Sequence, residues 1–143
     1  MKAIILAGGE GKRLKPVTGA LPKPMAPILG KPMMERIIEL LRDHGIIDIC
    51  ATLKYNPKPI TDYFGNGENF GVHLAYSYET EPLGTAGSVK KCRDFWQGDD
   101  FLVISGDAAC DFDLSYFMAE HRAIRPAVSI ALYPHPEPLQ YGL

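Results

Sequence analysis

Apolar residues along the chain form two kinds of pattern, short continuous runs and runs that recur every three or four positions. Residues 3–7 and 101–105 are continuous runs rich in β-branched side chains, which is typical of buried strands. Between residues 32 and 44, apolar side chains recur at helical spacing and polar ones take the other side, which predicts an amphipathic helix. Further patterns predict strands over residues 46–53, 72–78 and 127–133, and helices over residues 57–64, 84–95 and 114–122.

These strands and helices alternate along the chain, an order that is typical of a parallel sheet with helices on both faces. The predicted fold is therefore α/β, with a three-layer αβα, Rossmann-like and mostly parallel sheet. Sheets of this kind bind ligands beyond the carboxyl ends of their strands. We therefore expect the loops after Leu6, Tyr78 and Ser105 to meet at one edge and to form the binding site.

Length and composition exclude several kinds of partner. The chain has 143 residues, which suits one domain or part of a larger one, and its formal charge of −2 gives no reason to expect nucleic-acid binding. No apolar run approaches the roughly 18 residues of a membrane span, so no membrane partner is expected. The three cysteines are odd in number and lack metal-ligand spacing, which predicts free thiols and a reducing, cytoplasmic location.

The first predicted strand leads into a loop that is rich in glycine. Gly8, Gly9 and Gly11 allow a tight turn and the close approach of a ligand. Exposed backbone N–H groups in such a loop form a concavity that binds anions. Arg13 and Lys23 add fixed positive charge, so the loop predicts a phosphate site at the end of the first strand.

Two common phosphate-binding motifs do not fit this loop. The Walker pattern requires a glycine five positions before Gly11 and a Ser or Thr after Lys12, where Leu6 and Arg13 stand. In the dinucleotide fingerprint G-x-G-x-x-G, Leu14 takes the place of the third glycine. The loop instead contains the string A-G-G-x-G-x-R-L-x-P-x-T, followed by P-K-P. This string resembles the signature of the sugar-1-phosphate nucleotidylyltransferases, which are also called nucleotide-sugar pyrophosphorylases.

The resemblance implies an enzyme that transfers a nucleoside monophosphate from a nucleoside triphosphate to a sugar 1-phosphate. Arg13 and Lys23 would be its catalytic cations, the first holding the leaving pyrophosphate and the second bridging phosphates. The segment ETEPLGTAG resembles the family's base-recognition segment and places Glu79 against the base edge. A carboxylate only accepts hydrogen bonds, and guanine offers two adjacent donors where uracil or thymine offers one, which favours guanine. The implied nucleotide-binding residues are Leu6, Ala7, Gly8, Gly9, Gly11, Glu79, Gly84 and Thr85.

An acidic stretch follows the predicted strand over residues 101–105. Its Gly-Asp pair, followed by D-x-D-L, resembles the family's metal motif, in which Asp107 would bind Mg²⁺ as the cofactor. Mg²⁺ prefers one or two carboxylates together with waters and substrate phosphates. Asp113 directly precedes an apolar helical pattern, so it is predicted to be the N-cap of that helix.

The resemblance covers residues 1 to about 114 and leaves part of the family's site outside the chain. In the family, a second metal-binding Asp and the sugar-contacting Glu and Lys lie further along. Residues 1–143 are therefore expected to be the nucleotide-binding part of an incomplete nucleotidyltransferase domain. The PLGTAG form favours the GDP-mannose type, with a glucose-1-phosphate uridylyl- or thymidylyltransferase, or a nucleotide-binding module without turnover, as alternatives. A homo-oligomer is a further expectation, because family members often self-associate.

Overall fold

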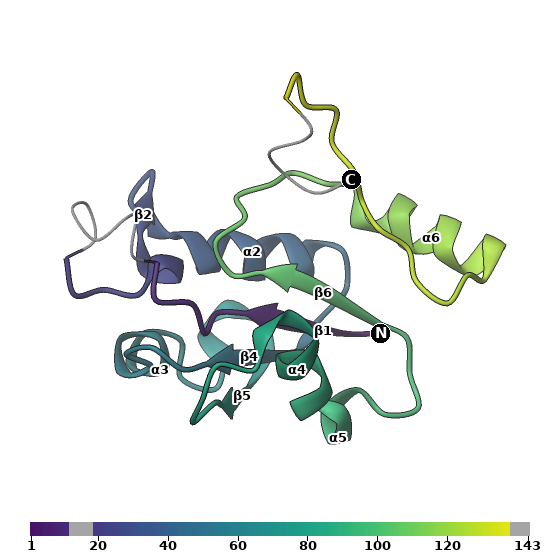
Figure 1. The fold of residues 1–143 in the computed structure, drawn as a ribbon. Helices are drawn as coiled ribbons and strands as arrows, with labels where there is room; N and C mark the ends of the chain where they lie inside the picture. The colour runs from purple at the N-terminus through teal and green to yellow at the C-terminus, as the bar shows by residue number, and fades with distance from the viewer. Residues whose placement is uncertain (12–18, 138–143) are drawn as a thin grey trace. The chain divides into compact units, whose positions relative to one another are not determined.

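The computed structural model describes residues 1–11 and 19–137 (Figure 1) and divides the chain into two compact units, residues 1–111 and 112–143. The first unit contains a four-stranded sheet in the order β5-β4-β1-β6, and every neighbouring pair is parallel. This result confirms the predicted α/β fold with a mostly parallel sheet. The strands are β1 (Lys2–Leu6), β4 (Asp48–Leu53), β5 (His73–Tyr78) and β6 (Phe101–Ser105).

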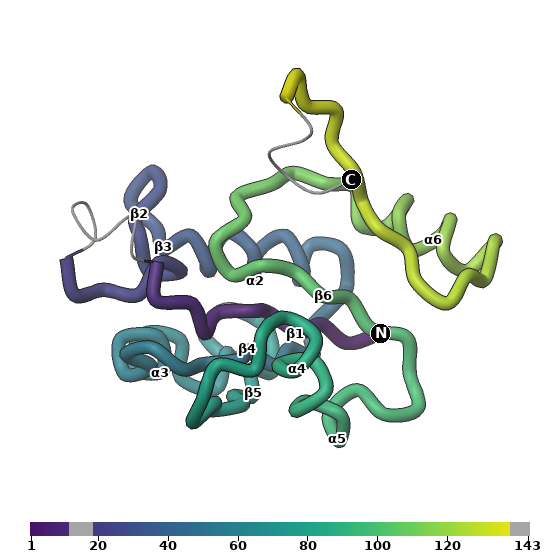
Figure 2. Tube along the Cα trace, viewed as in Figure 1, coloured from purple at the N-terminus to yellow at the C-terminus, as the bar shows by residue number. Residues whose placement is uncertain are grey.

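Helices flank this sheet on both sides, with α2 on one side and α4 and α5 on the other (Figure 1). The central strand β1 buries Ala3, Ile4 and Ile5 completely between these layers. Figure 2 follows the same trace and shows purple β1 between β4 and green β6. The helices are α2 (Met33–Asp43), α3 (Lys58–Phe64), α4 (Gly84–Lys91) and α5 (Arg93–Trp96), with short turns η2 (Lys23–Met25) and η3 (Glu68–Phe70) and a hairpin of β2 (Pro27–Ile28) and β3 (Lys31–Pro32).

The helix predicted over residues 84–95 is in fact two helices that meet at Cys92. Cys92 is buried, and its Sγ lies 3.7 Å from the Sγ of Cys50 on β4. After this point the chain turns so that Trp96 stacks on Phe101 of β6, with 4.6 Å between the ring centroids. The indole N–H of Trp96 also donates to the carbonyl of Val89 in α4, at 2.9 Å. Packing on the sheet therefore overrides the continuous helical pattern.

The second unit contains α6 (Leu114–Ile124), and its start confirms the predicted cap. Asp113 Oδ1 accepts a hydrogen bond from the backbone N–H of Tyr116 at 2.9 Å. The strand predicted over residues 127–133 is wrong, because residues 125–137 contain no strand. A strand requires a hydrogen-bonded neighbour, and an alternating apolar pattern cannot supply one. The apolar side chains of that pattern are instead exposed, with exposed fractions of 73% for Val128, 74% for Ile130 and 82% for Leu132.

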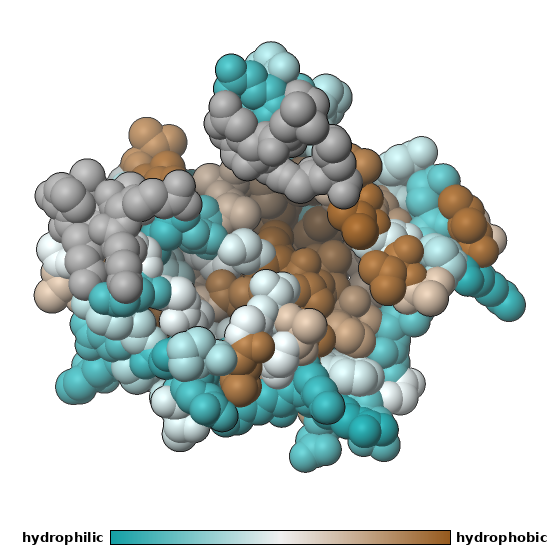
Figure 3. Space-filling model, in the orientation of Figure 1, coloured by the Kyte–Doolittle hydropathy of each residue, from teal (hydrophilic) through white to brown (hydrophobic). Residues whose placement is uncertain are grey.

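The side chains of the edge strand β6 are only partly covered. Val103 is 39% exposed, whereas Ile4 and Ile5 on the adjacent β1 are fully buried. Figure 3 shows hydrophobic residues gathered at the surface over this strand, in the middle of the view. Parallel sheets usually have both faces covered, so β6 is the strand on which the sheet departs from the expected layering. No helix in the described part of the chain is long and apolar enough to cross a membrane.

The turn between α3 and η3 contains a glycine that the packing requires. Gly67 has φ +88°, and a Cβ there would lie 2.8 Å from the Val72 carbonyl oxygen and 2.9 Å from the Leu74 Cβ. Gly45 has a similar φ of +76°, but open space surrounds its Cβ position. We expect Gly67→Ala to lower the free energy of unfolding by about 3 kcal/mol, because backbone strain and overpacking add. Gly45→Ala should cost about 1 kcal/mol, from strain alone.

Urea denaturation of the two variants beside the unchanged chain measures both losses. Equal losses at the two positions would contradict the clash at Gly67, since strain is common to both.

Candidate functional site

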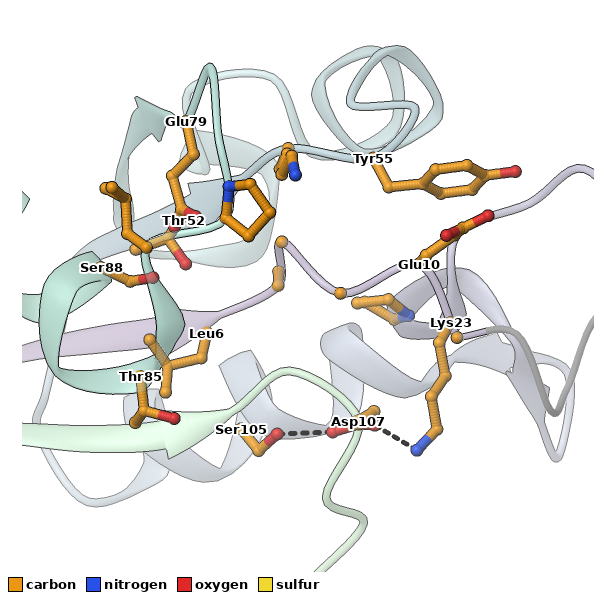
Figure 4. Close-up of a pocket in the computed structure, with 18 of the residues that line it drawn as sticks. Leu6, Glu10, Lys23, Thr52, Tyr55, Glu79, Thr85, Ser88, Ser105 and Asp107 are labelled. Carbon is orange, nitrogen blue, oxygen red and sulfur yellow. Dashed lines mark hydrogen bonds and ion pairs between the residues drawn. The ribbon is translucent and has the colours of Figure 1, made fainter.

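A cavity of about 1200 Å³ opens at the carboxyl ends of the parallel strands (Figure 4). Its walls come from the glycine loop after β1 and from the residues that follow β4, β5 and β6. The loops therefore meet at one edge of the sheet, as the topology predicts. All but one of the sequence-predicted site residues line this cavity, and Arg13 lies outside the described residues. Those that line it are Leu6, Ala7, Gly8, Gly9, Gly11, Lys23, Glu79, Gly84, Thr85 and Asp107.

The glycine loop is fixed at its start by the sheet and approached closely by η2. The N–H of Ala7 donates to the Thr52 carbonyl at 3.1 Å, which extends the pairing of β1 with β4 into the loop. Gly11 has φ +61°, and a Cβ at this position would lie 2.7 Å from the Cβ of Lys23. Glycine is therefore required at position 11 for two reasons, the left-handed backbone and the closeness of Lys23.

Lys23 and Asp107 form an ion pair at one end of the cavity (Figure 4). The Ser105 hydroxyl donates to the other carboxylate oxygen of Asp107, at 2.5 Å. Burial would raise the pKa of the Asp107 carboxyl, but the hydrogen bonds from Lys23 and Ser105 outweigh it and lower that pKa. Asp107 is therefore ionised at neutral pH, and Lys23 offsets its charge.

The Asp107 carboxylate alone could serve only a metal ion that brings most of its ligands with it. Among residues 1–11 and 19–137, no three His, Cys, Asp or Glu side chains gather closely enough to hold a metal by themselves. Mg²⁺ commonly takes one or two protein carboxylates and completes its shell with waters and phosphate oxygens. A single ionised carboxylate beside a predicted phosphate site fits that manner of binding.

Glu79, Thr85 and Ser88 lie at the other end of the cavity from Lys23 and Asp107 (Figure 4). Glu79 directly follows β5, and its Oε1 atom is buried without a hydrogen-bond partner in the described part of the chain. A buried acceptor that no group satisfies lowers stability, unless a ligand supplies the donor. This oxygen therefore marks a place where a bound molecule would donate a hydrogen bond.

Sequence reasoning missed the cavity residues at the end of β4 and directly after it. Thr52 is almost fully buried, and Lys54, Tyr55 and Asn56 line the cavity together with it. Ligands bind beyond the carboxyl ends of parallel strands, and β4 is one of these strands. The first polar residues after residue 53 could therefore have been predicted to line the site. Other lining residues outside the prediction are Glu10, Pro24, Pro82, Leu83, Ser88 and Ser105.

The fold and the cavity define an α/β protein with a glycine-rich loop beside a cavity at the carboxyl edge of a parallel sheet. A model of the nucleotidyl transferase family matches residues 2–143, and the chain belongs to that family. This confirms the resemblance carried by the glycine-loop motif.

Two curated relatives align with nearly the whole chain. A UTP–glucose-1-phosphate uridylyltransferase from Synechocystis sp. is 40% identical over 156 residues, covering 100% of this chain and 40% of the relative. A D-glycero-alpha-D-manno-heptose 1-phosphate guanylyltransferase from Aneurinibacillus thermoaerophilus is 39% identical, covering 99% of this chain and 61% of the relative. The chain therefore spans between 40% and 61% of the length of these two proteins.

A solved structure shares the architecture. The crystal structure of HddC from Yersinia pseudotuberculosis complexed with GMP-PN is 38% identical and superposes with a TM-score of 0.74. The match covers 84% of this chain and 53% of that one.

Proposed function

We propose that the protein transfers a nucleoside monophosphate from a nucleoside triphosphate to a sugar 1-phosphate, giving a nucleoside diphosphate sugar and pyrophosphate. Membership of the nucleotidyl transferase family and the names of the relatives support this reaction class. The observation that carries the proposal is one cavity with the glycine loop, the Lys23–Asp107 pair at one end and the buried Glu79 oxygen at the other. These groups suit the phosphates and the base of one nucleotide.

Neutralising charge is the main demand of this reaction. The phosphate of the sugar 1-phosphate attacks the α-phosphorus of the triphosphate, so two anionic groups must meet. Backbone N–H groups at Gly8, Gly9 and Gly11 would hold the triphosphate, and Lys23 would bridge its phosphates as a point charge. Arg13 would grip the leaving pyrophosphate with its fork of donors. No covalent intermediate is required, because positioning and electrostatics suffice.

Asp107 is the residue that we propose to hold Mg²⁺. When bound, that ion supplies Lewis-acid polarisation of the α-phosphate. Lys23, which neutralises Asp107 in the free protein, would then turn to the phosphates. The same ammonium would therefore serve as an internal counter-ion before binding and as a substrate contact afterwards.

Guanine is the base that the site favours. Glu79 Oε1 can only accept hydrogen bonds when ionised, and guanine offers two adjacent donors. We propose a product of the GDP-mannose type, with uridylyl or thymidylyl transfer to glucose 1-phosphate as the alternatives. The free cysteines Cys50, Cys92 and Cys110 support a reducing, cytoplasmic location.

Pyrophosphate release tests the proposal directly. The protein is incubated with Mg²⁺, one of GTP, UTP, dTTP or ATP, and each of several sugar 1-phosphates. We expect release that depends on both substrates and is fastest with GTP. Tight binding of a triphosphate without release would contradict the transferase and favour a nucleotide-binding module. Absence of both binding and release would overturn the nucleotide site itself.

A further inference from the structure

Gly8, Lys54 and Glu79 lie in one row across three neighbouring strands at the carboxyl edge of the sheet. Extending the parallel register past the strand ends pairs Gly8, two residues after β1, with Lys54, and pairs Lys54 with Glu79. The N–H of Glu79 donates to the Leu53 carbonyl at 2.8 Å. A Cβ at Gly8 would lie 3.5 Å from the Lys54 Cβ and 3.6 Å from the Glu79 Oε1. The side chains of Lys54 and Glu79 therefore border the same part of the cavity. Gly8, which has no side chain, does not fill it.

Neither Lys54 nor Glu79 pairs its charge with another group in the described part of the chain. Across residues 1–11 and 19–137, no hydrogen bond or ion pair engages either side chain. The two side chains are neighbours across strands with opposite charge, yet they do not bond to each other. Lys54 is half-buried, and the Glu79 Oε1 is out of contact with solvent. A buried acceptor is ordinarily satisfied, which points to a ligand that donates a hydrogen bond to Glu79. The unpaired ammonium of Lys54, which borders the same cavity, is then available to an acceptor on that ligand.

The edge of guanine has this pattern. Its O6 accepts a hydrogen bond, while the adjacent N1–H and the 2-amino group donate. Lysine is a recognised donor to guanine O6, and a carboxylate accepts from both donor positions. Adenine places an amino donor where guanine has O6, so it would meet the ammonium of Lys54 with the wrong group. Uracil and thymine offer the carboxylate only one donor.

We propose that Lys54 determines base specificity in this cavity, donating to O6 of a guanine whose N1–H and 2-amino group bind Glu79. The assignment rests on the proposed function and names the residue that completes its base contact. Lys54 neighbours Glu79 across the strands. Lys23 binds Asp107 at the end of the cavity opposite Glu79 (Figure 4). Lys54 therefore acts on the base and lies apart from the cations assigned to the phosphates.

Equilibrium binding by titration calorimetry, with Mg²⁺ present and without a sugar phosphate, tests this assignment. The ligands are GTP, ITP, ATP and 6-thio-GTP, in which a weakly accepting sulfur replaces O6. The unchanged protein should bind GTP about tenfold more tightly than 6-thio-GTP, because a hydrogen bond with a charged donor contributes on that order. It should also bind ITP, which lacks the 2-amino group, more weakly than GTP.

Lys54→Met should remove the discrimination against 6-thio-GTP and keep the discrimination against ITP. Lys54→Arg, which retains a charged donor, should restore part of the preference for GTP over 6-thio-GTP. Lys58→Met is the matched control, since Lys58 is an exposed residue of α3 that pairs with Asp62 at 2.6 Å and does not line the cavity. It should leave all four affinities unchanged.

Three results would overturn the role of Lys54. The first is equal binding of GTP and 6-thio-GTP by the unchanged protein. This result does not depend on the folding of any variant. The second is an equal loss for all four nucleotides in Lys54→Met, which would indicate a phosphate contact. The third is affinities that Lys54→Met leaves unchanged. If the unchanged protein binds none of the nucleotides, the proposed function fails instead, so the two failures are distinguishable.

Discussion

Replacing Lys23 with alanine should lower kcat/KM for pyrophosphate release about a hundredfold or more, roughly 3 kcal/mol of lost transition-state stabilisation. Lys23 forms an ion pair with Asp107 and lines the cavity beside the glycine loop. In the proposed transfer its ammonium would face phosphate oxygens as their negative charge shifts toward the leaving pyrophosphate. An electrostatic contact of this kind in a partly buried site is worth more than one at the surface.

Steady-state pyrophosphate release gives kcat/KM for this variant, and circular dichroism verifies that it is folded. Lys90→Ala is the control, because Lys90 is an exposed residue in the last turn of α4 outside the cavity. Turnover that stays unchanged in Lys23→Ala would remove Lys23 from the mechanism.

Gly11→Ala should reduce kcat/KM as much as Lys23→Ala does, although it removes no functional group. An alanine Cβ at this position would lie 2.7 Å from the Lys23 Cβ, which is attached to the backbone and cannot swing aside. The loop or η2 must therefore shift, and a catalytic group misplaced by about 1 Å can lose about a hundredfold in rate. The φ of +61° adds strain to the same backbone.

Gly19→Ala separates strain from displacement. Gly19 has φ +60°, but nothing lies within 4 Å of its Cβ position, so its substitution strains the chain without moving Lys23. We expect its kcat/KM to stay near that of the unchanged protein. If Gly11→Ala acts through Lys23, the double variant Gly11→Ala/Lys23→Ala should be no worse than either single variant. Losses that multiply in the double variant would show that Gly11 acts by another route.

The sequence predicts the strands of the first unit, because three of them contain continuous apolar runs and β5 alternates apolar and polar residues. Both patterns are local features of the sequence. The wrong strand over residues 127–133 shows the limit of that signal. Alternation indicates which face of a strand would be buried, but a strand also needs a neighbour, and pairing is set by distant parts of the chain. The division of the helix at Cys92 has a similar origin, since the packing of Trp96 on Phe101 leaves no mark on helical periodicity.

The residues of the candidate site were likewise predicted only in part. Glycines after a buried strand and an Asp after another were sufficient to predict the loop and Asp107, because parallel strands end at one edge. Lys54 was missed because a lysine in a polar loop has the same local pattern as a solvated one. Its position beside Gly8 and Glu79 depends on the register between three strands, which a single sequence does not display.

The Lys23–Asp107 ion pair has a thermodynamic consequence for the proposed reaction. A divalent cation alone would have to displace an ammonium, and a triphosphate alone would have to draw that ammonium away from a carboxylate. Whichever arrives first relieves the obstacle to the other, so the two affinities rise together, each by the same factor. The free protein should therefore bind a divalent cation alone or a triphosphate alone weakly. It should bind the complex of the two more tightly.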